Sequence, residues 1–420
     1  MSSDSNHGAG ARPGELAVLR SLREATPATR WLLISDFGFN MGFYSLMPFL
    51  AGELEQRGVA AASIGLVLGV RTLCQQGLYL VGGAIADRTE YRSIITLGCY
   101  LRFIAFGLFA VTLHPVALIA AAALTGVAAA LFTPAMKAYL AESATDNRSR
   151  TFALSAVLSE AGALTGPILG IALLSVGFSL GALAAGCLFL LWGLVLRARL
   201  PRRRGSEHGS DRTPWRAWLD VLGDRRFMAF SVALAGYAVL FQQLYLALPL
   251  ILTDIAGGQA GVALAFVLSA VTVVFLQARV TSCSERVMSP ASAMSVGLAV
   301  MGAAFLAPVI ADLLDLGPAL GTGCALVATV LLTLGTMIAF PYIMSTVAQL
   351  AGERQLGTYY GVFYLAGGLA ATAGNVAVGA LIDSADGRPG TPVWLLLFAT
   401  GVVSAAGINA MKSQISRPRW

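Results

Sequence analysis

A carboxylate and three glycines fall within a short stretch of a long apolar run. Glu160 is followed by Gly162, Gly166 and Gly170, with Pro167 between the last two. A charged side chain inside a bilayer is costly and is usually functional, whereas glycines spaced by four let a second helix approach closely. At about 100° per residue, Glu160 and Pro167 share one helix face and the glycines lie roughly opposite. The stretch therefore predicts a helix that packs through its glycines and presents an ionisable group to a cavity.

Four further charged residues lie within apolar runs of the same half of the chain: Asp36, Arg71, Arg102 and Lys137. Glu160 follows Arg150 by ten positions, which at 1.5 Å per residue places it about 15 Å into its span. We expect Glu160, Asp36, Arg71 and Arg102 to carry out proton coupling. In the alternative interpretation, Asp36 and Arg71 form a structural ion pair whose charges offset each other's desolvation, and Lys137 anchors its helix at the membrane interface.

The second half of the chain offers aromatic and amide side chains instead of charges within its apolar runs. Tyr237, Phe241 and Tyr245 recur every four residues, which places them on one helix face. An aromatic face can simply pack against another helix, but it can also form the wall of a cavity for an apolar ligand. The residues that we expect to line a substrate cavity are Phe43, Tyr237, Phe241, Gln242, Tyr245, Phe340, Tyr360, Phe363 and Tyr364.

The composition identifies the class of protein. Of 420 residues, 57% are apolar and only 12% are charged, whereas soluble domains are roughly one-quarter charged. The net charge of +6 comes from basic residues in loops beside apolar runs, so we do not expect nucleic-acid binding. The five cysteines have no paired spacing and no neighbouring histidine cluster, which argues against a metal site, and no pattern indicates a cofactor.

The apolar runs predict an all-α integral membrane protein with twelve transmembrane helices arranged as two six-helix bundles. A polar segment, 200–225, divides the runs six and six. We therefore expect a tail over 1–30, a first bundle over 31–199, a linker over 200–225, a second bundle over 226–411 and a tail over 412–420. The expected spans are 31–52, 64–86, 93–113, 115–139, 150–176, 179–199, 226–253, 259–281, 290–312, 317–346, 358–383 and 391–411.

Basic residues are distributed unevenly between the two sets of loops. Arginines and lysines gather in both tails, in the loop after the second span and in the linker, whereas only Arg57 and Arg388 lie in the opposite loops. Basic loops face the cytoplasm, so both termini and the linker should be cytoplasmic. We expect a multi-pass protein of a bacterial cytoplasmic membrane.

Prolines occupy matching places in the two halves. Pro48 corresponds to Pro249, and Pro134 corresponds to Pro341. Paired helix interruptions in two repeated halves are typical of transporters whose binding site lies between the repeats.

The segment 82–92 resembles the loop between spans two and three of the major facilitator superfamily, in which small residues precede an Asp-Arg pair and a second basic residue. It departs from that pattern at 89–91, where a glycine usually follows Asp-Arg. The resemblance implies that Asp87 locks the two halves at the cytoplasmic side by contacting a helix N-terminus near Thr358. The implied gating residues are Gly83, Asp87, Arg88, Arg92 and Glu142.

The run from Gly162 through Gly166 and Pro167 to Gly170 is similar to the fifth-span signature of the drug:proton antiporters in that superfamily. The arginine usual in span four is missing although Gly126 is present, and either Arg71 or Arg102 could replace it. The resemblance implies proton-coupled efflux of small lipophilic drugs, antibiotics or secondary metabolites by a monomer in the lipid bilayer. The alternatives are a proton-coupled importer of a metabolite or peptide, and a membrane enzyme or sensor that transports nothing.

Overall fold

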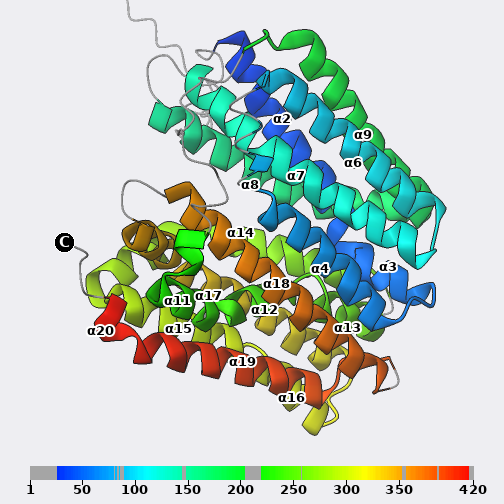
Figure 1. Cartoon of the computed structure of the whole chain (residues 1–420). Coiled ribbons are helices and arrows are strands. Elements are labelled where there is room, and N and C mark those ends of the chain that lie inside the picture. The colour runs from blue at the N-terminus through cyan, green and yellow to red at the C-terminus, as the bar shows by residue number, and fades with distance from the viewer. Residues whose placement is uncertain are drawn as a thin grey trace, which may run out of the picture.

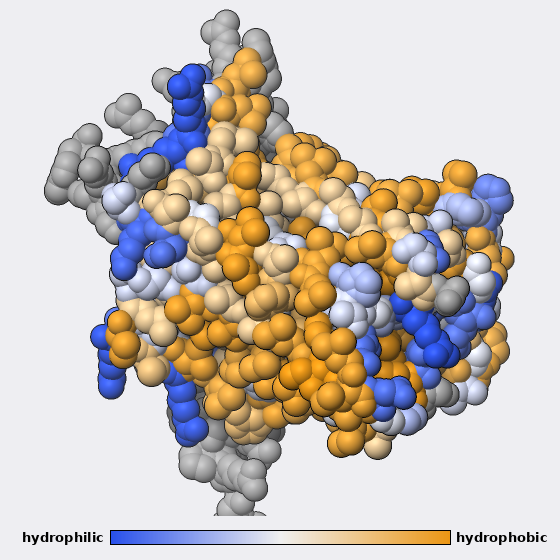
Figure 2. Space-filling view, turned by 90° about the horizontal axis from the view of Figure 1, so that it is seen from below, coloured by the Kyte–Doolittle hydropathy of each residue, from blue (hydrophilic) through white to orange (hydrophobic). Residues whose placement is uncertain are grey.

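The computed structural model describes residues 26–79, 81, 82, 85, 89–143, 148–203, 219–256, 258–351, 356–385 and 387–415. Over these ranges the chain forms long helices joined by short turns (Figure 1). The prediction of an all-α membrane protein is confirmed. Figure 2 shows a face that is apolar across its middle and polar toward its two ends, as a protein surrounded by lipid requires.

The helices of the first half correspond in position to the six spans expected there. Its helices are α2 (Pro27–Tyr44), the 3₁₀ turn η1 (Met47–Phe49), α3 (Leu50–Gln56), α4 (Ala61–Gly77), α6 (Tyr91–Val111), α7 (Pro115–Ser143), α8 (Arg148–Leu174) and α9 (Phe178–Arg199). The helices α2, η1 and α3 follow one another directly and cover the first expected span, 31–52, and α3 extends four residues beyond it.

The second half repeats this arrangement. Its helices are α11 (Arg225–Ala233), α12 (Ala235–Gln242), α13 (Ala247–Ala256), α14 (Ala260–Val287), α15 (Pro290–Ala303), α16 (Leu306–Leu313), α17 (Pro318–Ala351), α18 (Leu356–Asp383), α19 (Thr391–Ala410) and α20 (Lys412–Ile415). The helices α11 to α13 form one broken span, and α15 and α16 form another.

Ten helices of the described part are long and apolar enough to cross a membrane. The two remaining expected spans are the first two. The first is interrupted before Pro48, which has no N–H to continue a helix, and α4 ends at Gly77, close to positions outside the described residues. The twelve-span prediction is consistent with this arrangement.

The two halves meet mainly along one pair of helices. Within the first half, α2 packs against α8 and α6 packs against α7 and α9; within the second, α15 packs against α17 and α19. Between the halves, α4 packs against α18, α8 against α14 and α3 against α13 (Figure 1). We call the end that holds residues 200–203 and α20 the linker end, and the end that holds Arg57 and Arg388 the far end.

Small residues allow the closest helix contacts. The glycine stripe of α8 faces α2, and a Cβ atom at Gly166 would lie only 2.5 Å from the Cβ of Tyr44. Pro134, Pro167 and Pro341 lie inside α7, α8 and α17. Neighbouring helices can support such prolines within a membrane bundle.

The contact between α7 and α4 gives a test of this packing. At Gly126 a Cβ atom would lie 2.8 Å from the Cβ of Cys74 and 2.9 Å from the backbone nitrogen of Gln75. Because overpacking a tight contact typically costs 1–3 kcal/mol, we expect Gly126→Leu to destabilise the protein by about 2 kcal/mol and to lower its melting temperature in detergent.

The matched control is Gly323→Leu, because nothing lies within 4 Å of a Cβ atom at that position of α17. Its melting temperature should equal that of the wild type. Equal melting temperatures for the two variants would contradict the packing described here.

Candidate functional site

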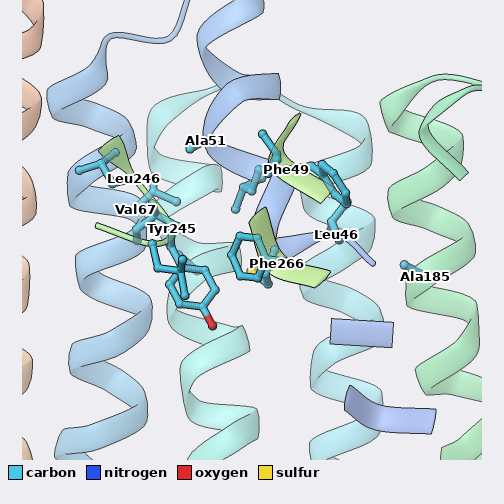
Figure 3. Close-up of a cluster of buried hydrophobic side chains, with 14 of the residues drawn as sticks. Leu46, Phe49, Ala51, Val67, Ala185, Tyr245, Leu246 and Phe266 are labelled. Atoms are coloured by element: carbon cyan, nitrogen blue, oxygen red, sulfur yellow. The ribbon is translucent and has the colours of Figure 1, made fainter. Parts of the chain in front are cut away.

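The first span of each half is broken at a corresponding depth. The helix α2 ends at Tyr44 and resumes in η1, while α12 ends at Gln242 and α13 begins at Ala247. Around these breaks, buried apolar side chains gather between the halves, and Figure 3 shows Leu46, Phe49, Tyr245, Leu246 and Phe266 among them. Because Leu46, Phe49 and Leu246 are at most 1% exposed, this cluster closes the space between the halves toward the far end.

Two cavities lie beside this cluster, between the two halves. The first has a volume of about 500 Å³ and the second of about 340 Å³. The first is lined by the charged and polar residues Asp36, Asn40, Arg71, Gln75, Arg102, Lys137, Ser155 and Glu160. The second is lined mainly by apolar residues, among them Phe266, Val273, Leu332, Met337 and Phe340. Tyr44, Glu160, Phe241 and Tyr245 line both cavities, so a ligand could occupy both at once.

Asp36 is held by short-range hydrogen bonds and not by an arginine. Its side chain is 7% exposed, and one carboxylate oxygen accepts a hydrogen bond from the Ser155 hydroxyl. The other accepts one from Asn40 Nδ2, at 3.3 Å. The structural ion pair with Arg71, which was one interpretation of the sequence, is not formed in the described part of the structure.

Arg71 faces the polar cavity from α4. Its guanidinium donates to Gln75 Oε1 at 2.9 Å and to Thr72 Oγ1 at 3.1 Å. The guanidinium carbon lies 5.6 Å from the ring centre of Phe43 and 5.8 Å from that of Tyr245. The hydrogen-bond and ring partners of this buried charge among the described residues are therefore all neutral.

Arg102 has even fewer polar partners. Its guanidinium carbon lies 5.5 Å, 5.7 Å and 5.0 Å from the ring centres of Phe43, Phe132 and Phe189. Its Nε atom is buried and has no hydrogen-bond partner among the described residues. Because cation–π contacts offset only part of the cost of desolvating a charge, the site holds positive charge that can attract an ionised carboxylate.

Glu160 lies where the two cavities join, on the face of α8 that points away from the glycine stripe. Within the described structure it forms no hydrogen bond or ion pair, and it is partly accessible. The polar cavity continues from Glu160 along α8 to Phe152, one turn from the start of that helix. The polar cavity therefore extends from Glu160 toward the linker end.

The residues predicted to line a substrate cavity are divided between two locations. Phe43, Phe241, Gln242, Tyr245 and Phe340 line one or both of the cavities described above. Tyr237 stacks at 6.3 Å on both Phe241 and Phe340. In contrast, Tyr360, Phe363 and Tyr364 are not part of these two linings; Tyr360 donates to the Met344 carbonyl, and Phe363 packs in the core of the second half.

Only some of the residues that the family resemblance assigns to gating are among those that the structure describes. Gly83, Asp87, Arg88 and the side chain of Glu142 lie outside the described residues. Arg92 is described, and its Nε lies 2.9 Å from Glu90 Oε1. Arg92 also donates to the Leu200 carbonyl at the end of α9, at 3.3 Å.

Several residues that line the cavities were not predicted from the sequence. Asn40 and Tyr44 follow Asp36 at intervals of four, and this spacing could have indicated their shared helix face. Ser155 is one and a half turns before Glu160 on α8, and only the packing of α2 against α8 brings it to Asp36. No feature of the sequence distinguishes Phe266 as a lining residue, because it is one apolar residue among many in α14.

Because the buried charge of Arg102 has few favourable contacts, replacing this residue should have an unusual effect on stability. Methionine can fill a similar space among Phe43, Phe132 and Phe189 without burying a charge. We therefore expect Arg102→Met to raise the free energy of unfolding by about 1 kcal/mol, measured as a higher melting temperature in detergent. Arg286→Met, at an exposed position of α14, should leave the melting temperature unchanged, whereas a clear loss of stability in Arg102→Met would show that the cation–π contacts dominate.

Comparisons with known proteins agree with this architecture. An uncharacterized MFS-type transporter of Mycobacterium tuberculosis is 33% identical over 97% of this chain and 99% of its own length. Multidrug resistance protein MdtH of Klebsiella pneumoniae is 31% identical over 89% of this chain and 91% of its own length.

Solved transporter structures share the fold at low sequence identity. The nucleoside transporter NupG matches with a TM-score of 0.78 and 14% identity over 91% of this chain and 99% of NupG. A POT family transporter bound to 5-aminolevulinic acid matches with a TM-score of 0.76 and 14% identity over 94% of this chain and all of the other. The sequence model of the Major Facilitator Superfamily covers residues 32–375. This chain therefore belongs to the Major Facilitator Superfamily and is a membrane transporter for small molecules, not an enzyme.

Proposed function

We propose that this transporter exports small lipophilic compounds, such as drugs, antibiotics or secondary metabolites, in exchange for protons. The observation that carries the proposal is the place of Glu160, which lines both a charged cavity and an apolar one. The similarity to MdtH, which is named as a multidrug resistance protein, supports an exporter. We further propose that the chain acts as a monomer.

The proposed orientation follows from the loops. The linker end carries Arg197, Arg199, Arg202, Arg203 and Arg92, whereas the far end carries Arg57 and Arg388. By the positive-inside rule the linker end faces the cytoplasm. The structure then corresponds to an inward-facing state, with its cavities accessible from the cytoplasm and an apolar cluster toward the outside.

Proton coupling would act through the cost of burying Glu160. When the cavity closes, an ionised Glu160 loses water, and this cost is largest if no cation or polar group replaces the water. A proton removes the charge and allows the empty cavity to close and return to the inside. A cargo that contacts Glu160 and fills the apolar cavity competes with that proton, so the two loads cross the membrane in opposite directions.

Asp36, Arg71 and Arg102 would tune this exchange. Arg71 and Arg102 place positive charge in the same cavity as Glu160, whereas Asp36 is a second carboxylate that can be protonated. Each charge moved across the membrane gains about 2.3 kcal/mol per 100 mV. A modest membrane potential therefore contributes usefully to export.

The proposal predicts a separation between binding and pumping in Glu160→Gln. This variant cannot take up or release a proton, so it should still bind the lipophilic dye ethidium through the apolar cavity but lose pH-driven transport. We expect a loss of about tenfold or more, the size of a typical coupling between two ligands. The measurement is dye movement in proteoliposomes with an imposed pH gradient.

Glu285→Gln is the matched control, because Glu285 is an exposed carboxylate at the linker end of α14. It should transport at the wild-type rate. Undiminished pumping by Glu160→Gln would contradict the proposal. Uptake of the dye instead of extrusion, in cells with and without a protonophore, would favour an importer.

A further inference from the structure

The start of α4 is stabilised by the other half of the molecule. The residue that precedes it, Ala60, has no side chain that could cap the helix. Instead, the carboxylate of Asp383, at the end of α18, accepts hydrogen bonds from the backbone nitrogens of Ala61 at 2.7 Å and Ala62 at 2.9 Å. A carboxylate at a helix N-terminus satisfies free N–H groups and interacts favourably with the helix dipole.

We propose that Asp383 locks the far gate of this transporter and that protonation of the neighbouring Glu55 tightens the lock. Opening at the far end must separate α4 from α18 and so break both hydrogen bonds from α4. Opening also leaves the first turn of α4 without any local cap. Asp383 therefore favours the state that is open only at the linker end.

Other contacts at the same place are polar and close. Gln259 donates to Glu53 Oε1 across the two halves at 3.0 Å, and a Cβ atom at Gly52 would lie 2.5 Å from Thr253 Oγ1. A cavity of about 600 Å³ beside the lock is lined by Glu55, Ala61 and Asp383, among others. Because this seal is polar and next to a cavity, water can replace its hydrogen bonds when the far gate opens.

Acidic groups outnumber basic ones around Glu55. Asp254 of α13 and Asp383 of α18 face it from the second half, and Arg388 follows α18 and pairs with Asp254 at 3.3 Å. Its own helix adds Glu53, and Arg57 follows directly but lies over the ring of Phe178, 4.6 Å from its centre. Ionised Glu55 is therefore repelled by two carboxylates that approach it only while the far gate is closed.

These surroundings change the titration of Glu55, which lies beyond the first membrane span. Burial raises the pKa of Glu55 to about 7, and the nearby charge of Asp254 and Asp383 adds to this effect while Arg388 opposes it. When the halves separate, the pKa should fall toward its ordinary value. Proton binding therefore favours the closed gate, whose stability declines as the pH rises through 7.

This lock is consistent with the proposed exchange cycle. It depends on that proposal in one respect only, namely that the far end faces the outside of the cell. Protons outside would load the cavity and would also favour closure of the gate behind them. Both effects act in the same direction, toward the return to the inward-facing state.

The lock can be tested by distance measurements without cargo or a pH gradient. Spin labels would be attached to cysteines introduced at the exposed positions Gln56 and Ser384, in a protein that lacks its five native cysteines, and double electron–electron resonance would report their separation. In Asp383→Ala the population with a long distance should rise about fivefold, the effect of a lost helix cap. Asp383→Asn keeps an acceptor but loses the charge and should give a smaller rise.

Asp312→Ala is the matched control, because Asp312 is also acidic and near the far end but bonds within its own half, to Thr391 at 3.3 Å. It should leave the distance distribution unchanged. If Asp383→Ala and Asp383→Asn also left it unchanged, Asp383 would not be a lock. This outcome is independent of pumping by Glu160→Gln, so failure of the proton-exchange proposal and failure of the lock are distinguishable.

The role of Glu55 is tested separately, by the pH dependence of the same distance distribution. Between about pH 6 and pH 8 the long-distance population of the wild type should rise by up to roughly tenfold, since one unit of pKa corresponds to a factor of ten. Glu55→Gln cannot ionise and should remain closed over this range. An identical pH response in Glu55→Gln would rule out Glu55 as the sensor.

Discussion

The close contact between α4 and α18 is the constraint on which the rest of the structure depends. Gly65 and Gly69 of α4 lie directly against α18, and a Cβ atom at Gly69 would be 2.7 Å from the Cα of Thr372. At the far end, Gly379 faces the backbone of Ala61 in the same way. Because small residues let these backbones touch, the halves are joined along one line. The cavities exist because the halves diverge from that line toward the linker end.

The charged residues of the cavity follow from this geometry. Arg71 and Arg102 would be very costly in the core of one half, where no water could reach them and no counter-ion accompanies them. They are tolerated because they face a space between the halves and because aromatic rings surround them. Burying these two charges therefore lowers the stability of the interface but places positive charge in the cavity. The second half contributes the apolar wall, so the two halves differ in chemistry although they repeat in shape.

Polar contacts between the halves occur at two depths and have different physical consequences. Near the middle, Gln242 donates to Thr72 at 2.8 Å beside the cavity, where loss of water makes every charge expensive. At the far end, Asp383 and Glu53 make their contacts beside an open surface cavity, where water can replace them. In the two proposals above, a carboxylate in the middle therefore controls what the transporter carries across, whereas carboxylates at the far end control only how easily the halves separate. Alternating access needs both kinds of control.

The sequence by itself determined the membrane class, the helical character and which charged residues lie within apolar runs, because hydropathy, helix periodicity and the high cost of a buried charge are local properties of the chain. The resemblance of the 82–92 loop and of the Gly162–Gly170 stripe added the superfamily, which the comparisons confirm. Only the tertiary structure decided which groups meet. In the folded chain Asp36 accepts a hydrogen bond from Ser155 and does not pair with Arg71. Tyr360 and Tyr364 do not line the two cavities described. Asp383 caps a helix that begins 322 residues earlier in the chain. These pairings depend on how helices rotate and approach one another, and an apolar sequence in which almost every face is compatible with lipid or with protein does not specify that rotation.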